Sequence, residues 1–392
     1  MAPLRLGIIG LGAAGAGIVP ALASHGRVVL AGAADPDARL TANLARDFAV
    51  PVEADARALL ARTDIDAVYI ATPHQMHCEH AVMALEAGKH VVVEKPMALT
   101  LEECDRMILA AEAARRVLLV GHTHAYDAPI AVMRALIAGG STGRVSMVST
   151  WNYTDFLYRP RRPEELDTTQ GGGILFNQVP HQIDTVRFLV GAPVTRVRAA
   201  TGRLDARRPT EGNCMVWLEF ADGATASLVY SGYDRFDSDE MHGWIGERGQ
   251  PKKPNHGAAR RFIADLDARE EARLKRERFG YGLAASGGLA PASGSFHQPH
   301  FGILVVSCER ADLRPSADGV LVYDDSGVRE IAITQGAGLA GRDRVLDELV
   351  AAVQDGVAPE HDGRFARGTV AVMLAVQESA RERCEVVLGA EV

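Results

Sequence analysis

Lys95 is the first residue of this sequence whose type and position could support proton chemistry. It stands in the triplet Glu94-Lys95-Pro96, directly after an apolar run, His90–Val93, that is typical of a buried strand. Ligands of parallel α/β sheets bind beyond the carboxyl ends of the strands, so an ammonium group there could hydrogen-bond a substrate hydroxyl. The triplet alone fits a surface lysine beside a proline turn equally well.

His181 is the second such residue. It follows the glycine run Gly171–Gly173, and it lies four residues after Asn177 and three before Asp184. If the segment is one helix, Asn177 and His181 share a face, and Asp184 could orient the imidazole ring. A lone histidine on a helix is more often structural, but a histidine flanked in this way favours a proton-handling group.

A cluster of three arginines precedes that glycine run: Arg159, Arg161 and Arg162. Guanidinium groups bind carboxylates through two parallel hydrogen bonds, so the cluster could bind a dicarboxylate substrate. A solvated basic loop paired with Glu164 and Glu165 is an equally good interpretation. His122 and His124 follow another predicted strand at the same sheet edge and could also line the substrate pocket.

The segment Gly10-Leu-Gly12-Ala-Ala-Gly15 follows an apolar strand and opens a predicted helix. In a dinucleotide-binding fingerprint the first glycine permits the turn, the second lets the backbone approach the diphosphate, and the third lets helix and strand pack closely. The N–H groups at the helix N-terminus would face the phosphates, and Ala13 and Ala14, just before Gly15, are expected to contact the coenzyme. This segment therefore predicts a bound dinucleotide.

Asp35 completes the fingerprint, twenty residues after Gly15 and at the end of the second predicted strand. Its carboxylate can accept both ribose hydroxyls and would repel a 2′-phosphate, which favours NAD over NADP. Arg39 could instead reach such a phosphate. Further coenzyme contacts are expected where later strands end: Thr72, Pro73, His77, Glu94 and Lys95.

The spacing of His74, His77 and His80 by three residues suggests a metal site. These positions drift around a helix, and only neighbouring pairs share a face. Hydride transfer to NAD also needs no metal. We therefore expect no metal, and we place His77 near the nicotinamide.

Strands and helices alternate over residues 1–124, which predicts a doubly wound parallel sheet. Predicted strands are Leu4–Ile9, Val28–Ala34, Ala67–Ala71, His90–Val93 and Val117–Val120; predicted helices are Gly15–Ser24, Leu40–Phe48, Ala56–Ala61, His77–Ala87 and Leu101–Arg115. Residues 125–392 contain alternating β-rich runs and helices, which predict an α+β domain with a largely antiparallel open sheet. Within it, residues 234–300 read as an insertion, either a lid, an oligomer arm or solvated filler, with one charged helical stretch, Arg260–Arg278.

Composition limits the function classes. The 392 residues are 47% hydrophobic and 23% charged, as in an ordinary globular protein of about two domains. A formal charge of −8 argues against nucleic acid as a partner. Five cysteines without a paired spacing favour a reducing cytoplasm over a disulfide framework.

The apolar run from Arg5 to Ser24 resembles a signal peptide, but its four glycines favour a strand, a turn and a helix. We expect no membrane association.

Together the fingerprint, Asp35, Glu94-Lys95-Pro96 and the Gly171–Asp184 stretch resemble the glucose–fructose oxidoreductase and inositol dehydrogenase family, Gfo/Idh/MocA. The resemblance covers residues 4 to about 235. It implies an N-terminal NAD-binding Rossmann domain and a C-terminal domain whose open sheet commonly serves dimerisation, so a homodimer or homotetramer is expected.

In that family a lysine, an aspartate and a histidine surround the reacting carbinol, and they correspond here to Lys95, Asn177 and His181. Asn177 departs from the usual aspartate, and Val179 from a usual glycine. The resemblance therefore leaves proton transfer to Lys95 and His181, with Asn177 as a hydrogen-bonding positioner of the substrate.

Two segments, Tyr158–Asp167 and Val306–Arg314, carry a narrower resemblance to bacterial phthalate cis-4,5-dihydrodiol dehydrogenases. It implies NAD-dependent oxidation of the cis-dihydrodiol of an aromatic dicarboxylate to the catechol. Two alternatives stay open: a sugar or inositol dehydrogenase of the same family, and a non-catalytic NAD-binding regulator, which the loss of the aspartate would favour.

Overall fold

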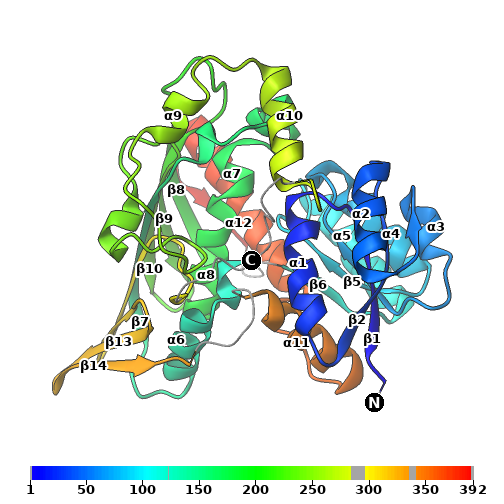
Figure 1. Cartoon of the computed structure of the whole chain (residues 1–392). Coiled ribbons are helices and arrows are strands. Elements are labelled where there is room, and N and C mark those ends of the chain that lie inside the picture. The colour runs from blue at the N-terminus through cyan, green and yellow to red at the C-terminus, as the bar shows by residue number, and fades with distance from the viewer. Residues whose placement is uncertain (1, 122, 284–295, 335–340, 390–392) are drawn as a thin grey trace. The chain divides into compact units, whose positions relative to one another are not determined.

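The structure, a computed structural model, describes residues 2–121, 123–283, 296–334 and 341–389, which fall into two compact units (Figure 1). The first unit comprises Met1–His122, Ala272–Pro291 and Arg342–Val370; the second comprises Thr123–Glu271, Ala292–Gly341 and Ala371–Val392. The first division lies two residues from the boundary expected after residue 124. The rest of the chain is not one continuous domain, however, because it returns to the first unit twice.

The first unit is built on a six-stranded parallel sheet with the order β3-β2-β1-β4-β5-β6. The strands are β1 (Leu4–Ile9), β2 (Val28–Ala34), β3 (Val52–Glu53), β4 (Ala67–Ile70), β5 (His90–Val93) and β6 (Leu118–Val120). The central strands are almost entirely buried, as the apolar runs predicted. The doubly wound sheet expected from the sequence is confirmed, and the N-terminal run forms β1 and α1.

Helices connect these strands: α1 (Ala13–Ser24), α2 (Ala38–Phe48), α3 (Ala56–Leu60), α4 (His77–Glu86) and α5 (Leu101–Ala114). Three of them start at side chains that accept a hydrogen bond from the first turn: Asp37, Asp55 and Thr100. Helix α11 (Arg342–Gln354) packs beside α1, although they are far apart in sequence (Figure 1). This contact explains why Arg342–Val370 belongs to the first unit.

The second unit contains a nine-stranded sheet with the order β14-β13-β12-β11-β7-β10-β9-β8-β15. Its strands are β7 (Val145–Tyr153), β8 (Val194–Gly202), β9 (Asn213–Phe220), β10 (Thr225–Ser231), β11 (Ile303–Cys308), β12 (Asp312–Pro315), β13 (Gly319–Asp324), β14 (Gly327–Ala332) and β15 (Val386–Val387). Among the described strands of this second sheet, only the β7–β10 pair is parallel. The prediction of a largely antiparallel sheet is therefore confirmed.

One face of this sheet is covered by α6 (Ala128–Ala138) and α8 (Val179–Val190), which pack on β7, β10, β12 and β13. The side chains of the opposite face include exposed apolar ones. Met215 is 65% and Trp217 is 44% exposed on β9. Across the ladder Met215 lies opposite Val229, and Val229 lies opposite Trp151, so the three form one row.

The insertion is structured over its described residues. It holds η6 (Ser238–His242), α9 (Ala258–Phe262) and α10 (Ala268–Phe279), so the single charged helix predicted over 260–278 is wrong. The helix breaks because Asp267 accepts a hydrogen bond from the N–H of Glu270 at 2.8 Å and starts a new helix. Arg208 and Glu271 form a buried ion pair with two contacts of 3.0 Å. These residues are packed rather than solvated filler.

The five cysteines are free thiols in the structure, and Cys78, Cys104 and Cys214 are buried. Within the described ranges, no helix combines the length and apolar character that a membrane crossing requires.

Candidate active site

The fingerprint loop of the first unit has the shape that a diphosphate requires. Gly10 has φ +93°, and a Cβ on it would lie 2.7 Å from the carbonyl oxygen of Ala71. A Cβ on Gly15 would lie 1.8 Å from the oxygen of Gly10, so helix α1 can approach the loop only without a side chain there. A Cβ on Gly12, in contrast, would meet nothing within 4 Å. This open space lies at the start of α1, where helix N–H groups have no intrahelical partners and favour phosphate.

Asp35 is fixed at the end of β2 by backbone hydrogen bonds. Its Oδ2 accepts from the N–H of Leu11 at 2.7 Å, and its Oδ1 accepts from the N–H of Asp37 at 2.8 Å. Arg39 donates through two nitrogens to Asp37, at 3.0 and 2.6 Å, and this pairing lowers the pKa of the Asp37 carboxyl. The guanidinium that could have favoured a 2′-phosphate is therefore held by a neighbouring carboxylate.

Tyr281 is a residue of this region that no sequence motif indicated. It follows α10 of the insertion, and its N–H donates to the carbonyl of Leu11 at 3.1 Å. Its own carbonyl accepts from Asn43 at 3.2 Å, and its hydroxyl donates to Asp47 at 3.1 Å. The side chain is buried, and so the end of the insertion is docked on the coenzyme loop of the first unit.

His77 and His80 position the loop after β4. The ring of His77 lies 2.9 Å from the carbonyl of Pro96 and 3.0 Å from the carbonyl of Thr72, and His80 Nδ1 lies 3.1 Å from Thr72 Oγ1. His77 is fully buried, and burial lowers its pKa to about 4. Its side chain therefore holds two loops together. In the described part of the chain, no group of three possible ligands is arranged to hold a metal ion.

Lys95 lies at the carboxyl end of β5 and is partly exposed, next to a cis peptide bond with Pro96. Glu94 has its carboxylate in the core, where it accepts a hydrogen bond from the hydroxyl of Tyr69. Burial raises the pKa of Glu94. The two neighbours thus differ: Lys95 is partly exposed at the sheet edge, whereas the buried Glu94 anchors the turn. Thr72 and Pro73 border the same edge after β4.

The segment that carries Asn177 and His181 in the second unit is two helices, not one. Helix α7 (Gly173–Asn177) ends at Gln178, and α8 begins at Val179. Pro180 has no N–H to continue the ladder, so the single helix that would align Asn177 with His181 is wrong. The amide nitrogen of Asn177 donates to the carbonyls of Gly173 at 2.8 Å and Gly171 at 3.4 Å. Asn177 therefore fastens its own glycine loop.

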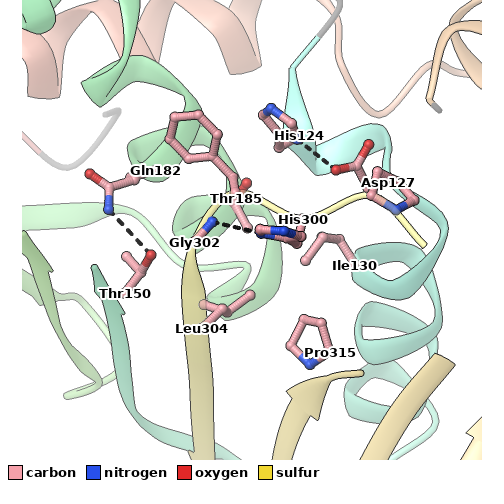
Figure 2. A pocket seen from close by; sticks show the side chains of 12 residues that line it. His124, Asp127, Ile130, Thr150, Gln182, Thr185, His300, Gly302, Leu304 and Pro315 are labelled. Atoms are coloured by element: carbon pink, nitrogen blue, oxygen red, sulfur yellow. Dashed lines mark hydrogen bonds and ion pairs between the residues drawn. The ribbon is translucent and has the colours of Figure 1, made fainter. Parts of the chain in front are cut away.

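His181 and His124 lie side by side in the second unit. Their ring centroids are 4.9 Å apart, and both rings contact Phe301, at 5.0 Å and 4.5 Å respectively. Figure 2 shows His124 directed at Asp127, with 2.6 Å between Nδ1 and Oδ2. His122 lies outside the described residues. Neither Phe301 nor Asp127 was singled out from sequence, although the i,i+3 spacing of His124 and Asp127 offered a signal.

A small cavity of about 20 Å³ adjoins these rings (Figure 2). Gln182 and Thr185 of α8 line it, together with His300. Gln182 donates to the carbonyl of Val229 at 3.1 Å, while its Oε1 and the hydroxyl of Thr185 have no hydrogen-bond partner among the described residues. A cavity of this size has room for a single water molecule, which these two polar atoms could bind.

The three arginines expected to bind substrate carboxylates have protein partners. Arg159 pairs with Asp155 at 2.7 Å, and Arg161 stacks 3.8 Å over the ring of Phe156 while donating to its carbonyl at 2.9 Å. Arg162 contacts Glu164 at 3.2 Å and Glu165 at 3.4 Å, as the alternative interpretation predicted. Arg159 and Arg162 keep a third or more of their side chains exposed, whereas Arg161 is buried.

Family models match most of the chain. Residues 4–122 match the Gfo/Idh/MocA model of an oxidoreductase family with an NAD-binding Rossmann fold, and residues 130–250 match the Gfo/Idh/MocA C-terminal domain. Among curated proteins, a 1-carboxy-3-chloro-3,4-dihydroxycyclohexa-1,5-diene dehydrogenase of Comamonas testosteroni is 41% identical over 96% of this chain and 95% of its own length. An inositol 2-dehydrogenase of Saccharopolyspora erythraea is 28% identical over 64% of this chain and 73% of its own length.

Solved structures agree with this assignment. A putative dehydrogenase from Bordetella bronchiseptica is 47% identical, with a TM-score of 0.93 over 98% of this chain and 100% of its own. A levoglucosan dehydrogenase in complex with NADH has a TM-score of 0.75 over 99% of both chains at 19% identity, which shows a shared fold alone.

Proposed function

Because this chain belongs to the Gfo/Idh/MocA oxidoreductase family, we propose that it is an NAD-dependent dehydrogenase that oxidises a carboxylated cis-dihydrodiol of an aromatic ring to the catechol. The observation that carries the proposal is the combination of the fingerprint loop with Lys95 at the carboxyl end of β5. The 41% identical relative that acts, by its name, on a carboxylated cyclohexadiene diol supports this substrate class.

Lys95 and His181 handle the proton in this proposal. Bound nicotinamide supplies the hydride acceptor. Lys95 takes the hydroxyl proton of the carbinol as its C–H bond gives up the hydride, and His181 assists through a hydrogen bond to the same oxygen. Asn177 holds the glycine loop and so positions the substrate.

The choice of NAD over NADP rests on Asp35 and Arg39. The carboxylate is fixed where ribose hydroxyls bind in this fold, and the neighbouring guanidinium is engaged by Asp37. A 2′-phosphate would meet the negative charge of Asp35, beside a guanidinium that Asp37 already holds. The expected coenzyme contacts are therefore the helix N-terminus at Ala13 and Ala14 together with Asp35.

The finer substrate assignment is a phthalate-type dicarboxylate. The partly exposed Arg159 and Arg162 border the segment that leads to α7, and each already neutralises an acidic partner. A carboxylate would bind there only by sharing these guanidinium groups. A monocarboxylated diol is therefore the first alternative substrate to test. An inositol or an aldose, as used by other members of the family, is the second.

A substrate panel tests the proposal. The purified protein is mixed with cyclohexadiene-diol mono- and dicarboxylates, inositols and aldoses, each with NAD and with NADP, and reduced coenzyme is followed by its absorbance. We expect turnover of the carboxylated diols with NAD. Turnover of inositols or aldoses alone would show that the substrate is a polyol or sugar and not a carboxylated diol. NAD binding without any turnover would support a non-catalytic regulator.

We also propose that the protein forms a homo-oligomer through the open face of the second unit's sheet. The row of Met215, Val229 and Trp151, with Trp217 beside it, presents apolar side chains on a face that no described helix covers. Contiguous exposed apolar surface of this kind is typical of protein interfaces.

A further inference from the structure

Asp127 is a carboxylate buried inside the second unit. Its side chain is 2% exposed, and its Oδ2 lies 2.6 Å from Nδ1 of His124. A buried carboxylate is stable only where donors surround it, so this nitrogen carries the proton. The imidazole then has its lone pair on Nε2, as in other aspartate–histidine pairs that act as bases.

His124 is placed beside the histidine already assigned to proton transfer. Its ring makes an edge contact with His181 and stacks on Phe301 at an interplanar angle of 30°. The hydroxyl of Thr123 donates to Asp184 of α8 at 2.5 Å, which ties the residue before His124 to the helix that carries His181. Two imidazoles are therefore held at a fixed separation by neighbouring elements of one unit.

Asn177 does not provide a base in this region. Its amide nitrogen donates to two backbone carbonyls, and an amide has no basic nitrogen. The carboxylate that contacts one of the two imidazoles directly is that of Asp127, and it acts through His124.

The proposed reaction needs two proton transfers at adjacent ring positions. Oxidation of the first carbinol carbon removes a hydride and its hydroxyl proton and leaves a ketone. The catechol then forms when the neighbouring carbinol carbon loses its C–H proton: that bonding pair becomes a ring double bond, and the carbonyl oxygen takes a proton. The sum is diol plus NAD giving catechol, NADH and one proton.

We infer that the Asp127–His124 pair catalyses this second step, so that the protein is an enol-forming isomerase as well as a dehydrogenase. The inference rests on the proposed function. His124 Nε2 takes the C–H proton, and the carbonyl oxygen takes back the hydroxyl proton that was released in the first step. Asp127 is a positioning residue that fixes the tautomer of His124 and stabilises its protonated ring. Phe301 offers a flat surface for the ring that becomes aromatic.

Single-turnover kinetics test the inference, because NADH and the catechol absorb at different wavelengths. In the wild type both products should form together. In His124→Gln the NADH phase should persist, and the catechol should follow about 100-fold more slowly, the usual size of a lost acid–base contribution. Asp127→Asn should delay the catechol in the same way but less. His256→Gln, a partly exposed histidine that pairs with Glu240, is the control.

Deuterium at the second carbinol carbon gives an independent readout. It should slow the delayed catechol phase of the variants and leave the NADH phase unchanged, which a merely structural defect would not do. Simultaneous NADH and catechol formation in His124→Gln, at the wild-type ratio, would overturn the inference. Absence of NADH from every carboxylated diol in the wild type would instead overturn the proposed function.

Discussion

The N–H of Leu11 donates to Asp35 Oδ2 across 2.7 Å, so the coenzyme loop and the acid at the end of β2 form one hydrogen-bonded unit. The acid therefore holds the loop, and in the proposed function it also presents a fixed charge to a ribose.

Replacement of Asp35 by Ser should weaken NAD binding and relax the discrimination against NADP. Loss of hydrogen bonds to a charged group costs about 1.5–3 kcal/mol, which corresponds to roughly 10–100-fold in the Kd for NAD. Calorimetric titration with both coenzymes measures this. Asp64→Asn, an exposed acid paired with Arg62, is the matched control. An unchanged NAD affinity in Asp35→Ser would remove the role assigned to this carboxylate.

Tyr281 should matter for coenzyme affinity although it lies far from the fingerprint in sequence. Tyr281→Ala removes the buried ring that docks the end of the insertion beside Leu11, and we expect the Kd for NAD to rise about tenfold, or about 1.4 kcal/mol. Tyr281→Phe keeps the ring and the backbone donor and loses only the bond to Asp47. It should bind NAD within about twofold of the wild type. Equal affinities in both variants would show that the docked segment does not support the loop.

Lys95→Ala should lower kcat by about 10²–10⁴-fold, the usual contribution of a positioned acid–base group. NAD should still bind, because the fingerprint loop and Asp35 are untouched. Steady-state kinetics with the best diol of the panel and calorimetry with NAD separate the two effects. Lys253→Ala, an exposed lysine of the insertion, should retain wild-type kcat. Near-normal turnover of Lys95→Ala would contradict its assignment as the base.

The local part of the fold was predictable from sequence, and the non-local part was not. Strands β1, β2 and β5 match their predicted bounds, because short apolar runs between turns are local signals. The break between α7 and α8 could also have been predicted, because Pro180 lacks the N–H that a continuous helix would need. The spacing of Asn177, His181 and Asp184 suggested one helix instead.

The candidate site was predictable only where a motif carried it. The glycine loop and Lys95 have such motifs. The docking of Tyr281 on Leu11 depends on packing between segments 270 residues apart, which no spacing rule encodes. The pairing of Arg159 with Asp155 and of Arg161 with Phe156 is local in sequence, but only Glu164 and Glu165 were expected from the sequence as partners of these arginines.

Asn177→Asp should destabilise the protein. The amide nitrogen now donates to the carbonyl of Gly173 at 2.8 Å, and a carboxylate in its place would face that oxygen as a like partial charge. We expect a loss of about 1–3 kcal/mol in the free energy of unfolding, the cost of an unsatisfied buried group. Thermal unfolding measures it, with Asn177→Ala as the control that removes the donor without adding charge. Asp should be worse than Ala, and the reverse order would contradict the argument.

Trp217→Glu should dissociate the oligomer. Trp217 is 44% exposed on β9, beside the row formed by Met215, Val229 and Trp151, and a charge there would be buried without a partner in a sheet-to-sheet interface. Light scattering after size-exclusion chromatography should show the mass of one chain for this variant and a multiple of it for the wild type. Leu204→Glu changes a residue that is 72% exposed outside the sheet, and it should keep the wild-type mass. If Trp217→Glu also keeps the wild-type mass, the subunits associate through another surface.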